Sequence, residues 1–410
     1  MNSEDVAGFF AERTALNREA YLELDYTFEC VGDPRVAAAR ICQEQSTAQW
    51  KRVGVEEDFR PRFGAQVVAF STERLGQGFS LALPNAPGGD VHRCTVTIAH
   101  PHANFGPRLP NLMSAVMGEG VFFVPGVPII KLEDIRFPDS YLAHFPGPQF
   151  GVDGLRELLD VHERPIVIGV VKPNIGLAPE PFAAIAEEAW MGGLDIAKDD
   201  EMLADPAWSP LATRSALLGA ARARAERATG EHKFYMANVT DEVSQLTRLH
   251  DLAVGNGANA LLVNVLPVGL SGVRLLREHS RVPLFGHFPM IAAAGRVPGF
   301  GIHSRVFTRL QRLAGCDAVI MPGFGPRMQM SSQEVLENVQ ACLEPMGPLR
   351  RVLPVPGGSD SAATLPRVYG TLGTRDFGFI AGRGIFGHPE GPRAGARSVR
   401  AAWAAIAEPA

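Results

Sequence analysis

The stretch PIVIGVVKPNIGLAPEPFAAIAEEAWMGGLDIAKDDE, residues 165–201, decides the fold. It opens and closes with a short apolar segment that ends in polar or charged residues, and residues 179–193 between them are typical of a helix. Strands that are apolar almost throughout are buried on both faces, which is typical of a parallel sheet. The stretch therefore predicts one strand–helix–strand unit of such a sheet.

The same unit recurs along the rest of the chain. Strand-like segments occupy residues 165–174, 194–201, 233–240, 260–269, 282–289, 317–325, 351–358 and 376–384. Eight β/α units in about 250 residues indicate a closed (β/α)8 TIM barrel, which we place at residues 138–410 with helices at its C-terminal end. An open, doubly wound sheet is the alternative.

Residues 1–137 have a different pattern. The segments 22–30, 65–71 and 94–100 are typical of strands, and residues 34–46 are typical of a helix. This mixture predicts an α+β (ferredoxin-like) domain with an antiparallel sheet. Residues 138–151, rich in Pro, Gly and aromatic side chains, make a plausible boundary between the two domains.

Composition and charge exclude several classes of function. The 39 Lys and Arg against 44 Asp and Glu give a net charge of −5, which argues against nucleic acid or an anionic membrane as partner. The five cysteines are scattered, so a disulfide framework or a zinc site is not expected. No apolar segment reaches the roughly 20 residues that span a bilayer. We therefore expect a soluble, cytoplasmic protein.

The carboxyl ends of the predicted barrel strands carry polar residues. In such barrels the chemistry gathers at this end. The candidates are Lys172, Asn174, Lys198, Asp200, Glu201, His287, Arg327, Gly357, Gly358, Gly382 and Gly384. Taken singly, KDDE suits a solvated charge cluster, a lone histidine suits the core, and glycine pairs suit turns. Their occurrence at consecutive strand ends favours a functional site.

These residue types suit one kind of chemistry. Asp200 and Glu201 offer hard oxygen ligands for Mg²⁺. The glycines that follow the last two strands leave backbone N–H groups open to an anion, at the usual phosphate position of a barrel. A metal, a phosphate site and a lysine together suit stabilisation of an enolate in a phosphorylated substrate.

The motifs resemble a known family. The segments GVVKPNIGLAPEPFAAIAEEAWMGGLDIAKDDEML, RVFTRLQRLAGCD, GRGIFGHPEGPRAGARSVRAAW and EQSTAQW are similar to the large chain of ribulose-bisphosphate carboxylase. The resemblance extends from Glu44 to Ala402. The resemblance is specific, because the KDDE motif and the GHP segment occur in the same order as in that family.

The resemblance implies roles for individual residues. Lys198 would be carbamylated by CO2 and, with Asp200 and Glu201, would hold Mg²⁺. Lys172 would shuttle protons, and His287 would lie near the hydroxyl groups of the substrate. The resemblance also places Gly357, Gly358, Gly382 and Gly384 at a phosphate. It implies a homodimer with shared active sites, in which the partner subunit supplies Glu44, Gln49 and Trp50.

Departures from the family pattern point to the RuBisCO-like (form IV) branch. Asn174 replaces a lysine, Gly120 an asparagine, and Arg327 the mobile-loop lysine that holds CO2. The second phosphate would lose all three donors, because the aligned residues are Phe288, Ile320 and Pro356. A buried dianion without partners costs several kcal/mol. We therefore expect a substrate with one phosphate and no carboxylation of ribulose bisphosphate, with Asn174 and Phe288 in the substrate pocket.

Three functions follow. The first is decarboxylation, or transcarboxylation with hydrolysis, of 3-oxo-isoapionate 4-phosphate, whose carboxylate Arg327 would hold and whose enolate Lys172 would protonate. The second is enolisation or isomerisation of a methylthio-ribulose or methylthio-pentanyl phosphate in methionine salvage. The third is a non-catalytic, regulatory barrel, which the intact KDDE motif disfavours.

Overall fold

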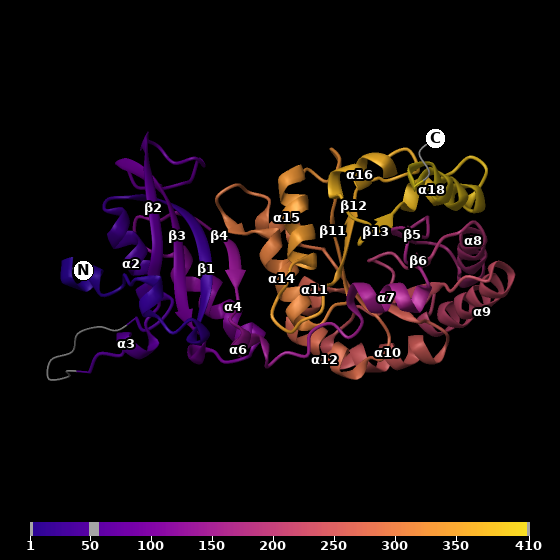
Figure 1. Cartoon of the computed structure of the whole chain (residues 1–410), viewed down its shortest axis with the longest axis horizontal. Helices are drawn as coiled ribbons and strands as arrows, with labels where there is room; N and C mark the ends of the chain where they lie inside the picture. The colour runs from indigo at the N-terminus through magenta and orange to yellow at the C-terminus, as the bar shows by residue number, and fades with distance from the viewer. Residues whose placement is uncertain (1–2, 49–56, 408–410) are drawn as a thin grey trace. The chain divides into compact units, whose positions relative to one another are not determined.

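The chain forms two compact units in the computed structural model, which describes residues 3–48 and 57–407 (Figure 1). The first unit consists of Met1–Phe145, Ile291–Leu310 and Met346–Pro348. The second consists of Pro146–Met290, Gln311–Pro345 and Leu349–Ala410. Two segments from the C-terminal part of the chain thus belong to the N-terminal unit, so neither unit is one continuous stretch of sequence.

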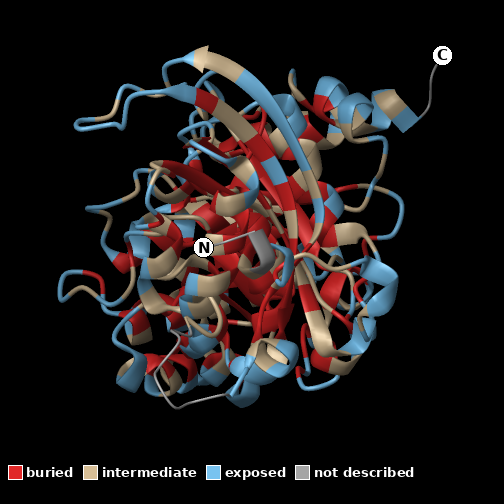
Figure 2. Ribbon diagram, turned by 90° about the vertical axis from the view of Figure 1, so that its left-hand side faces the viewer, coloured by how far each residue is buried: buried red, intermediate tan, exposed pale blue. Residues whose placement is uncertain are grey.

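The N-terminal unit is built on a five-stranded sheet with the order β10-β4-β1-β3-β2. Buried and partly exposed residues alternate over residues 21–28 of β1, as expected for a strand with one covered face. Figure 2 colours the chain by burial and shows buried residues gathered in the interior. The pairs β1–β3, β1–β4 and β2–β3 are antiparallel, and only the short β10 runs parallel to β4. The strands are β1 (Tyr21–Val31), β2 (Gln66–Gln77), β3 (Asp90–Pro101), β4 (Ile129–Arg136) and β10 (Gly301–Ile302).

Short helices accompany this sheet. The helix α2 begins where the Asp33 side chain accepts a hydrogen bond from the Arg35 amide at 2.8 Å, and Pro34 follows the cap. This α+β unit confirms the predicted fold class. The helices are α1 (Ser3–Ala7), α2 (Pro34–Glu44), α3 (Arg60–Phe63), α4 (Leu109–Met117), α5 (Glu119–Phe122), α6 (Asp139–Leu142) and α13 (Ile291–Gly295).

The second unit is a closed barrel of eight parallel strands in the order β11-β12-β13-β5-β6-β7-β8-β9. Pairing of β11 with β9 closes the ring. All eight predicted strands are present, and the open sheet is wrong. They are β5 (Ile166–Val170), β6 (Ile196–Lys198), β7 (Phe234–Asn238), β8 (Ala260–Asn264), β9 (Leu284–His287), β11 (Ala318–Pro322), β12 (Leu353–Gly357) and β13 (Gly378–Ile380).

Helices follow the strands around the barrel. No helix among the described residues is long and apolar enough to cross a membrane. The helices are α7 (Gly151–Leu159), α8 (Pro179–Met191), α9 (Leu211–Thr229), α10 (Leu246–Gly255), α11 (Val265–Val268), α12 (Leu270–His279), α14 (Ser304–Ala314), α15 (Ser332–Leu343), α16 (Leu365–Leu372), α17 (Gly382–Phe386) and α18 (Pro392–Ala407).

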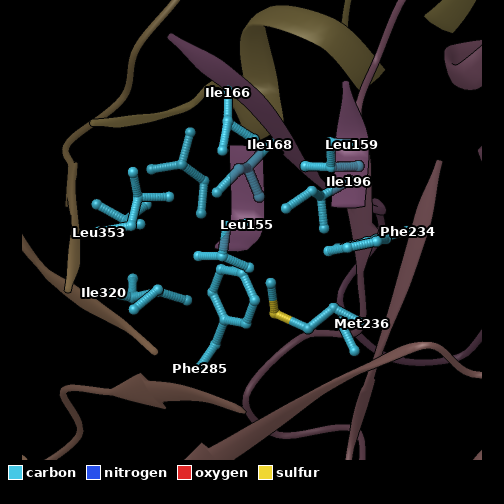
Figure 3. Packing of buried hydrophobic residues seen from close by; sticks show 14 of the residues in the cluster. Leu155, Leu159, Ile166, Ile168, Ile196, Phe234, Met236, Phe285, Ile320 and Leu353 are labelled. Carbon is cyan, nitrogen blue, oxygen red and sulfur yellow. The ribbon is translucent and has the colours of Figure 1, made fainter. Parts of the chain in front are cut away.

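The amino-terminal end of the barrel is filled by an apolar core. Leu155 and Leu159 of α7 pack with residues that begin strands, among them Ile166, Phe234 and Leu353, and their side chains point toward one another (Figure 3). Each buried side chain of this size contributes about 1.5–3 kcal/mol of transfer free energy. The core closes this end, which leaves the carboxyl ends of the strands for a site.

One buried carboxylate connects several segments at the amino-terminal end of the barrel. Asp317, just before β11, accepts hydrogen bonds from the backbone amides of Phe150 at 2.6 Å and Leu284 at 2.9 Å. It also pairs with the buried Arg277 guanidinium at 2.9 Å. Because the charge has both an ionic partner and amide donors, it can be buried without a large loss of stability.

Candidate active site

The carboxyl ends of the barrel strands surround a cavity of about 410 Å³. Its walls come from β5, β6, β9, β11, β12 and β13, so residues far apart in the sequence meet there. Of the predicted site residues, Lys172, Asn174, Lys198, Glu201, His287, Phe288, Arg327, Gly357, Gly358 and Gly382 line it. Such a polar cavity within a rigid barrel is the usual place for a ligand.

Lys198 is the last residue of β6 and is fully buried. Its Nζ atom donates to the Asp199 carbonyl oxygen at 2.9 Å and lies 3.7 Å from Glu201 Oε2. Burial lowers the pKa of Lys198, because a charged ammonium loses its water. The neutral amine that this favours is the form that can attack CO2.

The two aspartates after Lys198 have different tasks. Asp199 is buried and accepts from the Arg214 guanidinium at 3.1 Å and the Tyr235 hydroxyl at 3.0 Å. Asp200 instead accepts from Lys172 Nζ at 3.1 Å. Asp199 therefore anchors the segment after β6, while Asp200 faces the groups of the site.

Two asparagines hold the backbone of this segment. Asn238, at the end of β7, donates from Nδ2 to the carbonyl oxygens of Asp200 at 3.1 Å and Glu201 at 3.0 Å. Asn264, at the end of β8, donates to the Glu201 carbonyl at 2.8 Å. Both follow strand ends, which was the signal for them in the sequence, although we did not include them in the expected site.

Lys172 is held by two acceptors. Its ammonium group donates to Asn174 Oδ1 and to Asp200 Oδ2. The asparagine that departs from the family pattern is thus a hydrogen-bond partner for this lysine. A fixed ammonium beside the cavity can deliver a proton to a substrate atom.

His287 ends β9 and is buried. Its Nε2 atom lies 3.6 Å from Glu201 Oε2, and its ring stacks on Phe288 with 4.7 Å between ring centres. Burial, with the Lys198 charge nearby, holds the pKa of His287 well below its usual value. The ring is therefore neutral near pH 7. Its Nδ1 atom is buried and has no hydrogen-bond partner within the described ranges.

The donor set fits a magnesium ion. Asp200 and Glu201 supply carboxylate oxygens, which are hard ligands of the kind that Mg²⁺ takes, and both lie by Lys198 or Lys172. A carbamate on Lys198 would replace the buried amine with a third oxygen ligand. A second group of side chains of types that can ligate a metal is found on α10 and α12, away from the cavity residues. It consists of His250, Asp251 and His279, and both histidines hydrogen-bond to the Asp251 carboxylate.

The predicted phosphate end contains an unexpected carboxylate. The Gly358 amide donates to Asp360 Oδ2 at 3.1 Å, and Asp360 lines the cavity. Burial raises the pKa of Asp360. A Cβ on Gly384 would lie 2.7 Å from the Asp360 carbonyl oxygen, so Gly384 faces this loop and is not a wall residue. The sequence analysis assigned Gly357 and Gly358 to a phosphate and did not include Asp360, which follows them by two residues.

The remaining expected residues are distributed as follows. Glu44 is exposed at the end of α2 in the N-terminal unit, and Gln49 and Trp50 lie outside the described residues. The role of all three at a partner's site stays a prediction. Ile320 lines the cavity together with Phe288. Arg327 and Arg383 also line it, and neither forms an ion pair with another described residue.

The comparisons with known proteins identify the family. Residues 151–410 match the sequence model of the ribulose bisphosphate carboxylase large chain, catalytic domain, and residues 29–141 match that of its N-terminal domain. The chain belongs to this family. Within it, the RuBisCO-like (form IV) assignment is confirmed by the relatives that share most of its sequence.

Three proteins illustrate what this RuBisCO-like chain is similar to. Ribulose bisphosphate carboxylase-like protein 2 of Rhodopseudomonas palustris is 63% identical over 407 residues, covering 99% of this chain and 94% of the relative. The 3-oxo-isoapionate-4-phosphate decarboxylase of Rhizobium rhizogenes is 33% identical, with coverage of 94% and 93%. The crystal structure of octameric RuBisCO from Pyrococcus horikoshii has a TM-score of 0.87 at 30% identity, with coverage of 98% and 91%.

Proposed function

We propose that this RuBisCO-like protein is a Mg²⁺-dependent enzyme that forms an enolate from a substrate with one phosphate, and that it decarboxylates 3-oxo-isoapionate 4-phosphate. The observation that carries the proposal is the meeting of Lys172, Lys198 and Glu201 in one cavity. Its wall also contains Arg327, which forms no ion pair with another described residue. A relative at 33% identity is named for this decarboxylation. When bound by Asp200, Glu201 and carbamylated Lys198, magnesium would supply a Lewis acid at the substrate's keto oxygen.

The chain's own residues account for the other parts of the reaction. Arg327 holds the carboxylate of the β-keto acid before its C–C bond breaks and CO2 leaves. The bonding electron pair passes into the enolate, and the Lys172 ammonium protonates the carbon that lost CO2. Asn174 and Asp200 keep that ammonium in place, and water returns a proton to Lys172 after each turnover.

The same cavity disfavours a bisphosphate. Phe288 and Ile320 line it where the carboxylase pattern has a phosphate-binding arginine and histidine, and Pro356 replaces the serine. A second dianion there would have no donors, at a cost of several kcal/mol. Carboxylation of ribulose bisphosphate is therefore not proposed.

The apolar wall also supports the second candidate. Phe288 and Ile320 can contact an apolar end group such as the methylthio group of a methylthio-ribulose or methylthio-pentanyl phosphate. In that case the enzyme would be an enolase or isomerase. Arg327 separates the two candidates, because only the sugar acid has a carboxylate for it to bind.

Proton and carbon NMR in D2O tests the proposal. Protein with Mg²⁺ and bicarbonate is given 3-oxo-isoapionate 4-phosphate, and we expect loss of the carboxylate carbon with deuterium at the adjacent carbon. Lys172→Met and Lys172→Arg should both slow formation of the deuterated product strongly, since neither side chain can deliver a proton and arginine keeps the charge. Arg327→Ala should raise KM for this substrate, whereas Arg397→Ala on the exposed face of α18 should not.

The outcomes separate the candidates. No reaction with the sugar acid but turnover of a methylthio-sugar phosphate would replace the first proposal with the second. No reaction with either, together with no effect of Mg²⁺ on the protein, would favour a non-catalytic barrel.

We also propose a homodimer with shared sites. Glu44, Gln49 and Trp50 of one subunit would complete the cavity of the other, and the structure of Pyrococcus RuBisCO is that of an oligomer. Mixing inactive Glu44→Gln and Lys198→Met subunits tests this, because mixed dimers contain one intact site. Activity that returns on mixing supports sharing, and none at any ratio contradicts it.

A further inference from the structure

The predicted phosphate end of the cavity already contains an acidic side chain of the protein, that of Asp360. The amide nitrogen of Gly358, the residue after β12, donates to Asp360 Oδ2 at 3.1 Å. This is one of the amides that we expected to be free for a phosphate. Gly357 and Gly382 line the same part of the wall.

Several contacts fix the Asp360 carboxyl group. Only 4% of the residue is exposed, and its other oxygen accepts from the Thr364 hydroxyl at 3.0 Å. Its backbone is held closely as well, because a Cβ on Gly384 would come within 2.7 Å of the Asp360 carbonyl oxygen. The side chain therefore cannot swing into solvent without rearrangement of the loop.

We propose that Asp360 controls anion binding at this end, so that a phosphate group binds there only together with a proton on Asp360. The inference rests on the proposed function, because it takes the substrate to be phosphorylated. Two anions that share one site cannot both stay charged at low cost. With a proton from solvent, the Asp360 O–H donates to a phosphate oxygen, and the pair carries one negative charge fewer.

The surroundings agree with this role. Burial raises the pKa of Asp360, so the protonated form persists to a higher pH than for an exposed carboxyl group. The Arg367 charge opposes the shift but does not cancel it. The other charged or titratable groups of the same cavity are Lys172, Lys198, Glu201, His287, Arg327 and Arg383. Because these also influence a pH profile, only a variant at position 360 isolates its contribution.

Sulfate is the probe for the test, since it keeps both charges from pH 5 to 8 and any pH dependence comes from the protein. Calorimetry in two buffers of different ionisation enthalpy measures affinity and proton uptake together. For the wild type we expect uptake of close to one proton per sulfate near neutral pH. We also expect affinity to fall by up to about tenfold per pH unit above the pKa of Asp360.

Asp360→Asn should remove both effects. The amide keeps the shape of the carboxyl group without its charge, so this variant should take up about one proton fewer per sulfate and bind sulfate at least about tenfold more tightly at pH 8. Asp153→Asn, at an exposed acid of the same barrel, is the matched control and should behave like the wild type. Thr364→Val keeps the carboxyl group but removes a donor to it, so it should move the pH profile upward.

The contrary outcomes are distinct. An unchanged profile in Asp360→Asn, or loss of sulfate binding at every pH in that variant with a normal unfolding transition, would overturn the role of Asp360. If Asp360→Asn does not fold, an unmoved profile in Thr364→Val would overturn it. A wild type that binds neither sulfate nor inorganic phosphate would remove the phosphate from the proposed function as well.

Discussion

The two ends of the barrel strands differ in what their residues do. β6 begins with Ile196 in the apolar core and ends two residues later with the buried amine of Lys198. β9 begins with Leu284 and ends with His287. The amino ends pack into an apolar core, whereas the carboxyl ends surround a cavity with several charged and polar side chains. Within each strand, only a few residues thus separate side chains that stabilise the barrel from side chains that line the candidate site.

The polar groups at the two ends differ in the same way. Asp317 at the amino end is buried with its ionic partner and three backbone amides. At the carboxyl end, His287 Nδ1 and Asn264 Oδ1 are buried without a partner in the described part of the chain. Unsatisfied buried groups cost stability. Of the two residues only His287 lines the cavity, so a ligand bound there could supply the missing partner of its ring.

The largest expected effect is at Lys198, where substitutions test the division of roles between the two ends of the barrel strands. Lys198→Met keeps the volume but removes the amine, so Mg²⁺-dependent turnover should fall by at least about 10³-fold. The melting temperature should not fall, because a desolvated amine is replaced by an apolar side chain. Lys198→Ala should lose the same activity with lower stability. Activity close to that of the wild type in either variant would remove Lys198 from the metal site.

At the other end, Asp317→Ala should affect stability alone. It leaves Arg277 buried without its partner, so the free energy of unfolding should fall by about 3–5 kcal/mol. Urea unfolding measures the loss, and kcat per folded molecule should be unchanged. A loss of activity without a loss of stability would show that the two ends are not separate.

A substitution at Gly384 tests the predicted phosphate end of the cavity through the loop that holds Asp360. Gly384→Val places its Cβ against the Asp360 backbone, which should cost about 1–3 kcal/mol and shift the loop that holds Asp360. The Michaelis constant for a phosphorylated substrate should rise several-fold with little change in kcat. Gly370→Ala, where a Cβ meets open space, is the control. Equal Michaelis constants in both variants would place the phosphate elsewhere.

The smallest effect is expected at Asn174. Asn174→Ala removes one of the two acceptors of the Lys172 ammonium, so kcat should fall by about tenfold, equal to 1.4 kcal/mol, with KM nearly constant. Asn174→Asp keeps the acceptor and should retain most activity. A change confined to KM would mean that Asn174 contacts the substrate and does not position Lys172.

Much of the fold could be predicted from the sequence, because each barrel strand is an apolar segment followed by polar residues. The strand β10 could not be, since Gly301 and Ile302 become a strand only by pairing with β4. The site residues at strand ends were predictable for the same reason as the strands.

The roles of the two KDDE aspartates were harder to predict. Nothing in KDDE separates Asp199 from Asp200, because the difference comes from Arg214 on α9 and Tyr235 on β7. Asp360 was missed for a similar reason. The role of Asp360 depends on its contact with the Gly358 amide and on the close approach of Gly384. No local sequence pattern indicates either contact.

The asparagines beneath the segment that follows β6 have a consequence for engineering. Asn238 and Asn264 bind the backbone carbonyls of Asp200 and Glu201, not their side chains. The path of the segment is therefore held in part by neighbouring strands, in addition to the anchoring by its own Asp199 side chain. Because the Glu201 carbonyl, and not its side chain, receives these bonds, we expect Glu201→His to keep the backbone path and to shift the proposed metal site from hard toward softer divalent ions.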